Sequence, residues 1–401
     1  MTAASPVGLV QVEIDSEDDG ALARLEPSRR YWVEVVNHGR VVGIVEQTSD
    51  GAGNLSIDRE ELIRNYGGTG SAELPGGSVG DLPFASVVVP TIYRRVDLLN
   101  RLVESLLELD YPDFEIIIVD NRVGSGHQPI PPFTHDGRVK IVTESTPGVS
   151  AARNRGIAEA RGEFLAFTDD DAKVDRNWLR AIALAFNDDP DVEAIGGMIR
   201  PFELDTQPQL WFEEFYGGFT RSFEAKKWSV ALVGDSDPLF PYSPGHFGAG
   251  CNMAVRRSTL EQLGGFDVRL GAGTVAKGAE DLRFFMEVLL SGREFAYVPS
   301  AMVRHSHRRT QRQFMEQVFG YGVGLTALFT NLIIDDPSHI VKILTRVPRG
   351  LRMLIAPVDR RSPSAQVSYP RWTQMVELLG MAYGPFAYVA STVQTRRARN
   401  H

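Results

Sequence analysis

The stretch FLAFTDDD, residues 164–171, joins a short apolar run directly to three consecutive carboxylates. A short apolar run of this kind is typical of a buried strand. Adjacent anions repel one another, and a cluster of them at the end of a buried strand is stabilised when a cation shares the charge. The alternative is a solvated acidic loop. The triplet alone does not decide between a cation site and a loop.

Strands and helices are predicted to alternate on both sides of this stretch. Strands apolar on both faces, separated by amphipathic helices, are typical of a mostly parallel sheet with helices covering it. The predicted strands are residues 86–89, 115–119, 139–142, 164–167, 194–198 and 294–298, and the predicted helices are 96–109, 149–160, about 177–186 and 282–290.

Polar residues follow three of the predicted strands at the point where each strand ends. They are Pro90-Thr91, Asp120-Asn121 and the triplet Asp169 to Asp171. Ligands of open parallel sheets bind beyond the carboxyl ends of the strands. We therefore expect these three clusters to converge on one site.

Three parts are predicted along the chain. Residues 1–82 form a small β-rich module, with a hairpin at 31–36 and 41–45, a helix at 57–66 and a glycine-rich linker at 67–78. The α/β pattern occupies residues 83–310, and residues 311–401 form a basic helical extension. We expect three helical segments in the extension, interrupted by prolines 337, 348, 357 and 370.

An irregular segment is predicted after residue 198, with six aromatic residues crowded between positions 211 and 223. These aromatics either line an acceptor cleft or pack as ordinary core. Residues 247–253 and 264–267 contain glycines that allow a backbone to approach a ligand closely.

The charge balance argues against general nucleic-acid binding, because 42 Lys and Arg stand against 51 Asp and Glu, a formal net charge of −9. The sign is uneven, since residues 304–401 contain 14 Lys and Arg and 5 Asp and Glu. Such asymmetry favours an anionic surface or partner near the C-terminal part. The alternative is a set of helices packed on the catalytic domain with solvated arginines.

The single cysteine, Cys251, has no internal disulfide partner, which favours a reducing compartment. Residues 1–19 lack a basic region followed by an apolar one. The longest apolar runs, 322–334 and 378–391, are shorter than the roughly 20 residues of a membrane span. We expect a cytoplasmic protein whose membrane contact, if it has one, is peripheral at the inner face of the cell membrane.

Five motifs in order resemble the signature of a family 2 glycosyltransferase with a GT-A fold, over about residues 84–310. They are VVVPT at 87–91, IIVDN at 117–121, GVSAARNRG at 148–156, DDD at 169–171 and GAED at 278–281. One departure is Tyr93, where many relatives carry a small polar residue before the basic one, here Arg94.

The resemblance implies a divalent metal, Mn²⁺ or Mg²⁺, bound by Asp169, Asp171 and His305. Carboxylate oxygens suit these hard cations, and neutral imidazole is compatible with Mn²⁺. Position favours His305 over His307. Arg304, Arg308 and Arg309 either help to hold the diphosphate or begin the basic extension.

The resemblance also implies a nucleotide-sugar donor site. Its predicted residues are Pro90, Thr91, Arg94, Asp120, Arg153, Asp169 and Asp170. The carboxylate of Asp120 can accept the imide N–H of uracil or thymine, which favours a UDP- or dTDP-sugar; its alternative role is to cap the following turn. Arg153 contacts phosphate or base, or else forms a structural salt bridge.

Asp281 is the general base that the resemblance implies, and Glu280 orients the base or the acceptor. Both are predicted at a helix N-terminus, which stabilises their anionic forms. In-line attack assisted by such a base inverts the anomeric centre. Capping of the helix is the alternative role for one of the pair.

The function predicted is that of a metal-dependent, inverting glycosyltransferase. The acceptor is a hydroxyl of a glycan, a lipid-linked molecule or a small molecule, and residues 311–401 offer a contact for an anionic membrane. The alternatives are a nucleotidyltransferase acting on a sugar phosphate, which usually has a glycine-rich loop after the first strand, and a non-catalytic nucleotide-sugar-binding protein.

Overall fold

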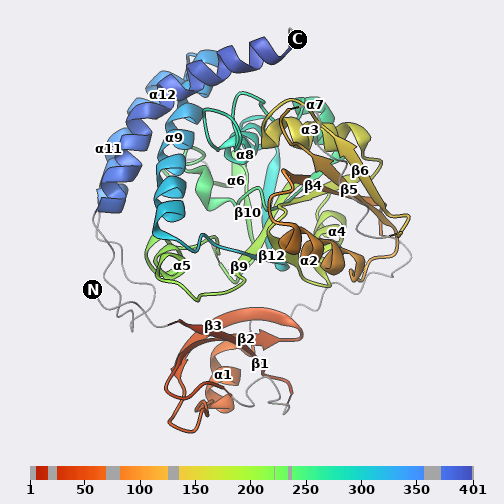
Figure 1. Cartoon of the computed structure of the whole chain (residues 1–401), viewed down its shortest axis with the longest axis vertical. Helices are drawn as coiled ribbons and strands as arrows, with labels where there is room; N and C mark the ends of the chain where they lie inside the picture. Colours follow the sequence, from red (N-terminus) through yellow and green to blue (C-terminus); the bar gives the residue numbers. More distant parts are fainter. Residues whose placement is uncertain are drawn as a thin grey trace.

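The computed structural model shows a central sheet with a small β-rich module at one end and long helices at the other (Figure 1). The residues it describes are 6–16, 25–68, 82–124, 135–220, 222–233, 237–355 and 372–399. Most of the predicted linker, from residue 69 on, lies outside them. The predicted boundaries at residues 82 and 310 fall between elements of these three regions.

The N-terminal module is a three-stranded sheet of β1 (Gly8–Glu13), β2 (Arg30–Asn37) and β3 (Arg40–Thr48), with helix α1 (Arg59–Tyr66). The predicted hairpin is confirmed, because β2 and β3 pair antiparallel. The Asp58 side chain caps α1 by accepting from the backbone N–H of Glu61. Strand β1, which pairs parallel to β2, was not predicted.

The main sheet has nine strands in the order β10-β12-β9-β11-β7-β4-β5-β6, with β8 paired to β12. Strands β4 to β7 are mutually parallel, and β11 is antiparallel to both neighbours. The strands are β4 (Ala85–Thr91), β5 (Phe114–Asp120), β6 (Val139–Thr143), β7 (Phe164–Thr168), β8 (Ala172–Val174), β9 (Val192–Pro201), β10 (Lys226–Trp228), β11 (Asn252–Arg256) and β12 (Glu294–His305).

Helices cover both faces of this sheet, which confirms the predicted α/β, mostly parallel fold class. Alternate side chains of β5 enter two different cores: Ile116 packs with residues of α2 and α4, and Ile117 with residues of α3, α7 and α8. The helices are α2 (Val96–Leu107), α3 (Val149–Glu159), α4 (Trp178–Asp188), α5 (Gln207–Trp211), α6 (Val230–Val233), α7 (Arg257–Leu263) and α8 (Glu280–Leu290).

Two predicted segments differ from the structure. The strand predicted at 294–298 continues to His305, because β12 passes through a register irregularity between Val298 and Met302 that accommodates Pro299. The segment predicted as irregular contains α5 and a π-helical turn, Phe212–Tyr216. Most of its aromatics pack as core: Trp211, Phe212 and Phe215 form a buried cluster with a C-terminal helix.

The described residues of the C-terminal extension form four helices, where three were predicted: α9 (Gln311–Asp335), α10 (His339–Leu344), α11 (Val347–Ile355) and α12 (Trp372–Arg399). Pro348 lies where α10 and α11 are divided, as predicted; it falls in the first turn of α11, where a missing N–H costs little. Pro385 lies inside α12. Pro357 and Pro370 lie outside the described residues.

Helix α9 is, by length and composition, able to cross a membrane, so the expectation that every apolar segment is too short is wrong. It runs beyond the apolar run at both ends and has 25 residues. However, 44% of its most apolar window is buried inside the protein, where α9 packs against α12 and the catalytic domain. A core helix of a soluble protein meets the same criteria.

Candidate active site

The carboxyl ends of β4, β5 and β7 meet at one edge of the sheet, as the strand order requires. Thr91 at the end of β4 donates its hydroxyl hydrogen to Asp170, with 2.7 Å between the oxygens. The backbone N–H of Asn121, after β5, donates to the carbonyl of Thr91 over 2.8 Å. The three polar clusters predicted to converge are therefore joined directly. Asp170 is half-buried, and burial raises its pKa to about 6 against the effect of the Thr91 hydrogen bond.

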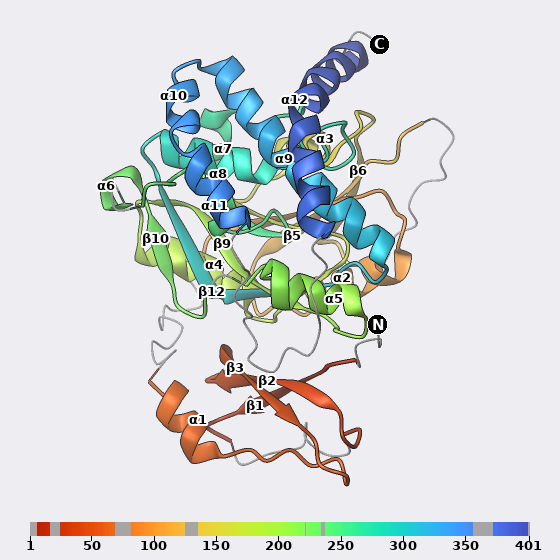
Figure 2. The same ribbon diagram turned by 90° about the vertical axis from the view of Figure 1, so that its left-hand side faces the viewer.

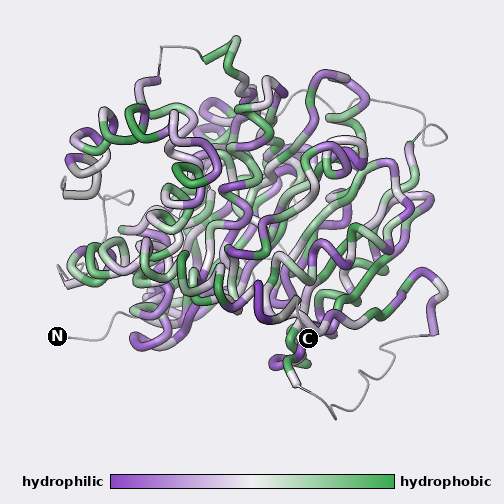
Figure 3. The backbone as a smooth tube through the Cα atoms, turned by 90° about the horizontal axis from the view of Figure 1, so that it is seen from above, coloured by the Kyte–Doolittle hydropathy of each residue, from purple (hydrophilic) through white to green (hydrophobic). Residues whose placement is uncertain are grey.

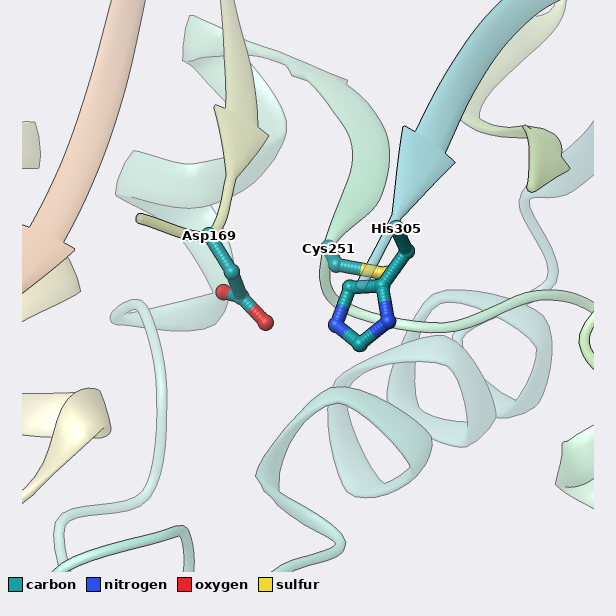
Figure 4. A group of neighbouring side chains, drawn as sticks. All are labelled: Asp169, Cys251 and His305. Atoms are coloured by element: carbon teal, nitrogen blue, oxygen red, sulfur yellow. The ribbon is translucent and has the colours of Figure 1, made fainter. Parts of the chain in front are cut away.

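Asp169, Asp171 and His305 come together from two strands. His305 ends β12, which pairs with β8 immediately after the triplet, so its Nε2 lies 3.1 Å from Oδ1 of Asp171. Ligand atoms of Asp169, Cys251 and His305 lie within 4.8 Å of one another. Figure 4 shows the Asp169 carboxylate and the His305 ring pointing into the same space.

The donor set fits a divalent cation such as Mn²⁺ or Mg²⁺. Two carboxylates and one imidazole are ligands that Mn²⁺ accepts, and the carboxylates suit Mg²⁺ as well. Burial raises the pKa of the Cys251 thiol well above its ordinary value, and the surrounding carboxylates add to the shift. Mn²⁺ and Mg²⁺ are hard cations that prefer oxygen ligands to soft sulfur, so we assign Cys251 to the lining of the site.

Asp171 is held in its anionic form by His305, Arg95 and Arg308. Burial alone would raise its pKa, but His305, Arg95 and Arg308 outweigh burial and lower it. Arg95 makes a direct ion pair with Asp171, and Nη1 of Arg308 lies 3.8 Å from it. Arg95, the N-cap residue of α2, was not predicted; the predicted neighbour, Arg94, is exposed in the bend before it. Arg308 adjoins the metal candidates, in line with a diphosphate contact.

Arg153 links the two halves of the site from the buried face of α3. Its Nη1 lies 2.7 Å from Oε1 of Glu280, and its Nη2 lies 3.2 Å from both Oδ1 of Asp169 and the carbonyl oxygen of Gly250. The guanidinium is 1% exposed. The structure thus places Arg153 in the salt-bridge arrangement, and a contact to donor phosphate or base stays a prediction.

Glu280 and Asp281 begin α8, as predicted. The backbone N–H groups of Gly250 and Leu282 donate to separate oxygens of Asp281, at 2.6 and 2.8 Å, which fixes the carboxylate and leaves each oxygen a second lone pair. Burial and the charge of Asp281 raise the pKa of Glu280, although Arg153 opposes the shift. Because Glu280 forms an ion pair with Arg153, Asp281 is the better placed of the two carboxylates to act as a base.

Asp120 is paired bidentately with Arg122, its Oδ1 lying 2.9 Å from Nε and its Oδ2 lying 2.6 Å from Nη2. It also accepts the backbone N–H of Arg122 over 3.2 Å, which is the turn-capping alternative. Arg122 lies over the ring of Tyr93, 5.3 Å from its centroid. Tyr93, the residue at which this sequence departs from many relatives, is therefore joined to Asp120 through Arg122. Pro90 is buried within β4, where it pairs in register with Val119, the residue before Asp120.

His307 and Glu213 form a buried pair behind the metal candidates that sequence reasoning missed. Nε2 of His307 lies 2.7 Å from Oε1 of Glu213, and its Nδ1 lies 3.5 Å from Nδ1 of His305. Glu213 sits in the π-helical turn, 94 residues before His307. The spacing left no local signal in the sequence, although π-helical turns are frequent at functional sites.

The site combines parallel strands that end in a carboxylate and imidazole cluster with a second acidic pair at a helix N-terminus, groups that can offset the charge of a leaving diphosphate and accept a proton. Comparison with known proteins points to transferases of this kind. The family model of glycosyl transferase family 2 matches residues 86–264. Residues 86–264 are therefore similar to a family 2 glycosyltransferase domain.

Two curated relatives are similar to this chain. A pre-mycofactocin glycosyltransferase of Mycobacterium tuberculosis is 26% identical over 214 residues, covering 52% of this chain and 42% of the relative. A glucosyl-dolichyl phosphate glucuronosyltransferase of Haloferax volcanii is 26% identical over 288 residues, covering 69% of this chain and 85% of the relative. The chain thus spans about two fifths of the mycobacterial protein.

Among solved structures, the mannosyltransferase PcManGT from Pyrobaculum calidifontis, in complex with GDP-Man and Mn²⁺, is 20% identical. The match covers 81% of this chain and 82% of that protein, with a TM-score of 0.47.

Proposed function

We propose that this protein is a metal-dependent, inverting glycosyltransferase that moves a sugar from a UDP- or dTDP-type donor to an acceptor hydroxyl. The acceptor is a glycan, a lipid-linked molecule or a small molecule. The observation that carries the proposal is the convergence of Asp169, Asp171 and His305 beside Arg153 and Asp281.

The donor diphosphate would bind where the metal candidates meet the cations around them. Asp169, Asp171 and His305 would hold the Mn²⁺ or Mg²⁺ ion, which supplies positive charge to offset the leaving diphosphate. Arg95 and Arg308 already face Asp171 and add positive charge at the same place. Stabilising a leaving group by fixed charge in a buried site is a large part of enzymatic rate enhancement.

Asp281 would take the proton of the acceptor hydroxyl. As the acceptor hydroxyl oxygen attacks the anomeric carbon of the donor sugar, the bond from that carbon to the diphosphate oxygen breaks, and the anomeric centre inverts. Two backbone N–H groups hold the Asp281 carboxylate. Because Gly250, one of the two donors, also accepts from Arg153, the base and the metal candidates share a rigid connection.

The group of Asp120, Arg122 and Tyr93 supports the preference for a pyrimidine nucleotide. The Asp120 carboxylate can accept an imide N–H, while Arg122 joins it to Tyr93. The single cysteine, which is buried, supports a reducing compartment such as the cytoplasm. The Haloferax relative, whose name states a dolichyl phosphate substrate, supports a lipid-linked acceptor.

The test is a donor screen on the purified full-length protein with Mn²⁺ or Mg²⁺. UDP-, dTDP- and GDP-sugars are compared by thermal shift, and bound donors are then assayed for hydrolysis and transfer with the anomeric configuration of the product determined. Asp281→Asn should lower kcat about 10²- to 10⁴-fold and leave the donor-induced shift unchanged. Glu316→Gln, at an exposed position on α9, is the matched control.

Two results would contradict the proposal. One is a protein that neither hydrolyses nor transfers from any donor of the panel; release of pyrophosphate from a sugar phosphate and a nucleoside triphosphate would instead identify a nucleotidyltransferase. The other is a full transfer rate in Asp281→Asn.

A further inference from the structure

Helix α12 has an inverted distribution of side chains. Its buried positions are small or polar, and its large apolar side chains point outward. The buried set is Thr373, Gly380, Gly384, Ala387, Tyr388 and Ser391, and the exposed set, called here the outer face, is Met375, Leu378, Leu379, Tyr383, Phe386, Val389 and Val393. Phe386 is 71% exposed. Exposing a contiguous apolar surface of this kind to water is unfavourable, and such surfaces usually mark a site of interaction with a membrane or another molecule.

Close backbone contact explains why the inner positions of α12 are small. A Cβ at Gly384 would lie 2.0 Å from Oγ1 of Thr326, and one at Gly380 would lie 2.3 Å from the carbonyl oxygen of Phe319. A Cβ at Gly322 of α9 would lie 2.1 Å from the carbonyl oxygen of Glu377. Glycine-mediated packing of two helices is the arrangement found where lipid surrounds them.

Both ends of α12 are tied to the catalytic domain. Near its start, Glu377 accepts from the Tyr216 hydroxyl over 2.8 Å. Near its end, Ser391 and Thr395 donate to the carbonyls of Arg269 and Val268, over 2.6 and 3.4 Å. A helix held at both ends lies along the domain, so α12 cannot cross a bilayer while these contacts persist. Only its outer face is available to lipid.

Cations accompany the outer face. Helices α10 and α11 lie on the same side of the molecule as α12, away from the N-terminal module (Figure 2). They add exposed apolar residues, Val341 and Leu344 among them, and the exposed cations Lys342, Arg349 and Arg352. Figure 3 shows hydrophobic and hydrophilic residues intermixed along the backbone, and near the C-terminal end of α12 the residues Arg396 and Arg397 are exposed.

Acidic residues are nearly absent from the same helices. In the described ranges 339–355 and 372–399, Glu377 is the single acid, and it faces Tyr216. Two copies of this surface placed together would bring like charges into contact, whereas an anionic bilayer neutralises them. A large apolar face flanked by Lys and Arg is the pattern of helices that lie in the membrane interface.

We propose that α10, α11 and α12 dock on an anionic lipid bilayer, with α12 in the plane of the interface and its outer face inserted at the headgroup and acyl boundary. The stretch from Met375 to Val393 rises about 27 Å along the helix, so the contact is an extended strip. Lipid contact of this kind needs neither a membrane span nor glycosyl transfer.

The docked surface is connected to the loop that holds Asp281, the proposed base. The hydroxyl of Tyr242 lies 2.7 Å from Nδ1 of His339 at the start of α10, and Ile343 shares a buried cluster with Tyr242 and Leu270. Tyr242 precedes the loop whose Gly250 N–H binds Asp281. Resting on the proposed function, this places the catalytic base on a domain oriented by the bilayer, as a lipid-linked acceptor requires.

The test is co-sedimentation of the full-length protein with vesicles of phosphatidylcholine alone or mixed with phosphatidylglycerol. We expect binding to the anionic vesicles that weakens with salt. The double variant Leu379→Gln/Phe386→Gln should bind at least tenfold more weakly, and Arg396→Glu/Arg397→Glu should lose the preference for anionic lipid. The control is Ile63→Gln, a change at a half-exposed apolar position on α1.

Donor-induced thermal shift, measured without vesicles, separates this proposal from the proposed function, since no outer-face variant touches the donor site. Failure of the wild type to bind anionic vesicles, or equal binding by the outer-face variant and the wild type, would overturn membrane docking. A dimer in analytical ultracentrifugation that the outer-face variant abolishes, without vesicle binding, would assign the surface to a second copy.

Discussion

Replacing Glu34 by Gln should detach the N-terminal module from the sheet that carries the metal candidates. Glu34 lies on β2 and is 1% exposed. Its Oε1 lies 2.9 Å from Nε of Arg200 on β9, and both of its oxygens contact Arg304 on β12. Arg304 directly precedes His305. The Glu34–Arg304 ion pair therefore joins the N-terminal module to β12, the strand that positions His305, a proposed metal ligand.

The expected cost is large because the substitution leaves buried guanidinium groups without their counter-charge. Breaking a buried ion pair from one side costs about 3–5 kcal/mol. A glutamine amide still fits the space, but its N–H₂ group faces a guanidinium where a carboxylate oxygen was. Against a total stability of about 5–15 kcal/mol, the module should open locally while the rest of the chain stays folded.

Hydrogen exchange by mass spectrometry measures this opening. Protection of peptides from β2 and β3 should fall about 10²- to 4 × 10³-fold in Glu34→Gln. The control, Glu316→Gln, removes an exposed i,i+4 pair with Arg312 and should cost about 0.5 kcal/mol or less.

The effect should also depend on pH. Burial alone would raise the pKa of Glu34, but Arg200 and Arg304 outweigh burial and lower it. A lowered native pKa contributes stability that is present above the unfolded value, about 4.3, and is lost as pH falls through the native value. The wild-type advantage should therefore persist at pH 5 to 8 and shrink below about pH 4. A Glu34→Gln protein as protected at pH 7 as the Glu316→Gln control would refute this reasoning.

Two further changes test the surroundings of the site and the helix pair. Glu213→Gln should weaken Mn²⁺ binding about tenfold in a metal titration, because Glu213 orients His307 and through it His305; unchanged affinity would make the pair purely structural. Gly384→Val should destabilise the protein by about 1–3 kcal/mol or more and lower its melting temperature accordingly, since the new Cβ would lie 2.0 Å from Oγ1 of Thr326 on α9. Gly350→Ala, where nothing lies within 4 Å, should be neutral or slightly stabilising in the same calorimetric scan; equal effects of the two would contradict the close contact.

The central strands could be predicted from the sequence because their signal is local. Runs such as Val87 to Val89 are buried on both faces, and that burial demands continuous apolar residues. Strand β11 gave no such signal, because its five residues follow a glycine-rich loop and are buried only by insertion between β7 and β9. Strands β8 and β10, of three residues each, depend on pairing with β12.

The positions of the site residues followed from the strand ends, but their side-chain partners did not. Thr91 and Asp170 meet because parallel strands end at one edge. The pairing of Arg95, instead of Arg94, with Asp171 depends on where helix α2 begins, which sequence patterns define poorly. Contacts between Glu213 and His307 join distant segments, and no local pattern encodes them.

Binding of Mn²⁺ to the cluster of Asp169, Asp171 and His305 is the central claim, and electron paramagnetic resonance of free Mn²⁺ tests it directly. Titration of the full-length protein should show one site per chain. Asp171→Asn should lose it or bind at least tenfold more weakly, while Asp191→Asn, an exposed acidic position outside the site, should bind like the wild type. Addition of UDP should tighten Mn²⁺ binding in the wild type. Equal Mn²⁺ binding by wild type and Asp171→Asn, or no binding by the wild type with UDP present, would contradict the account.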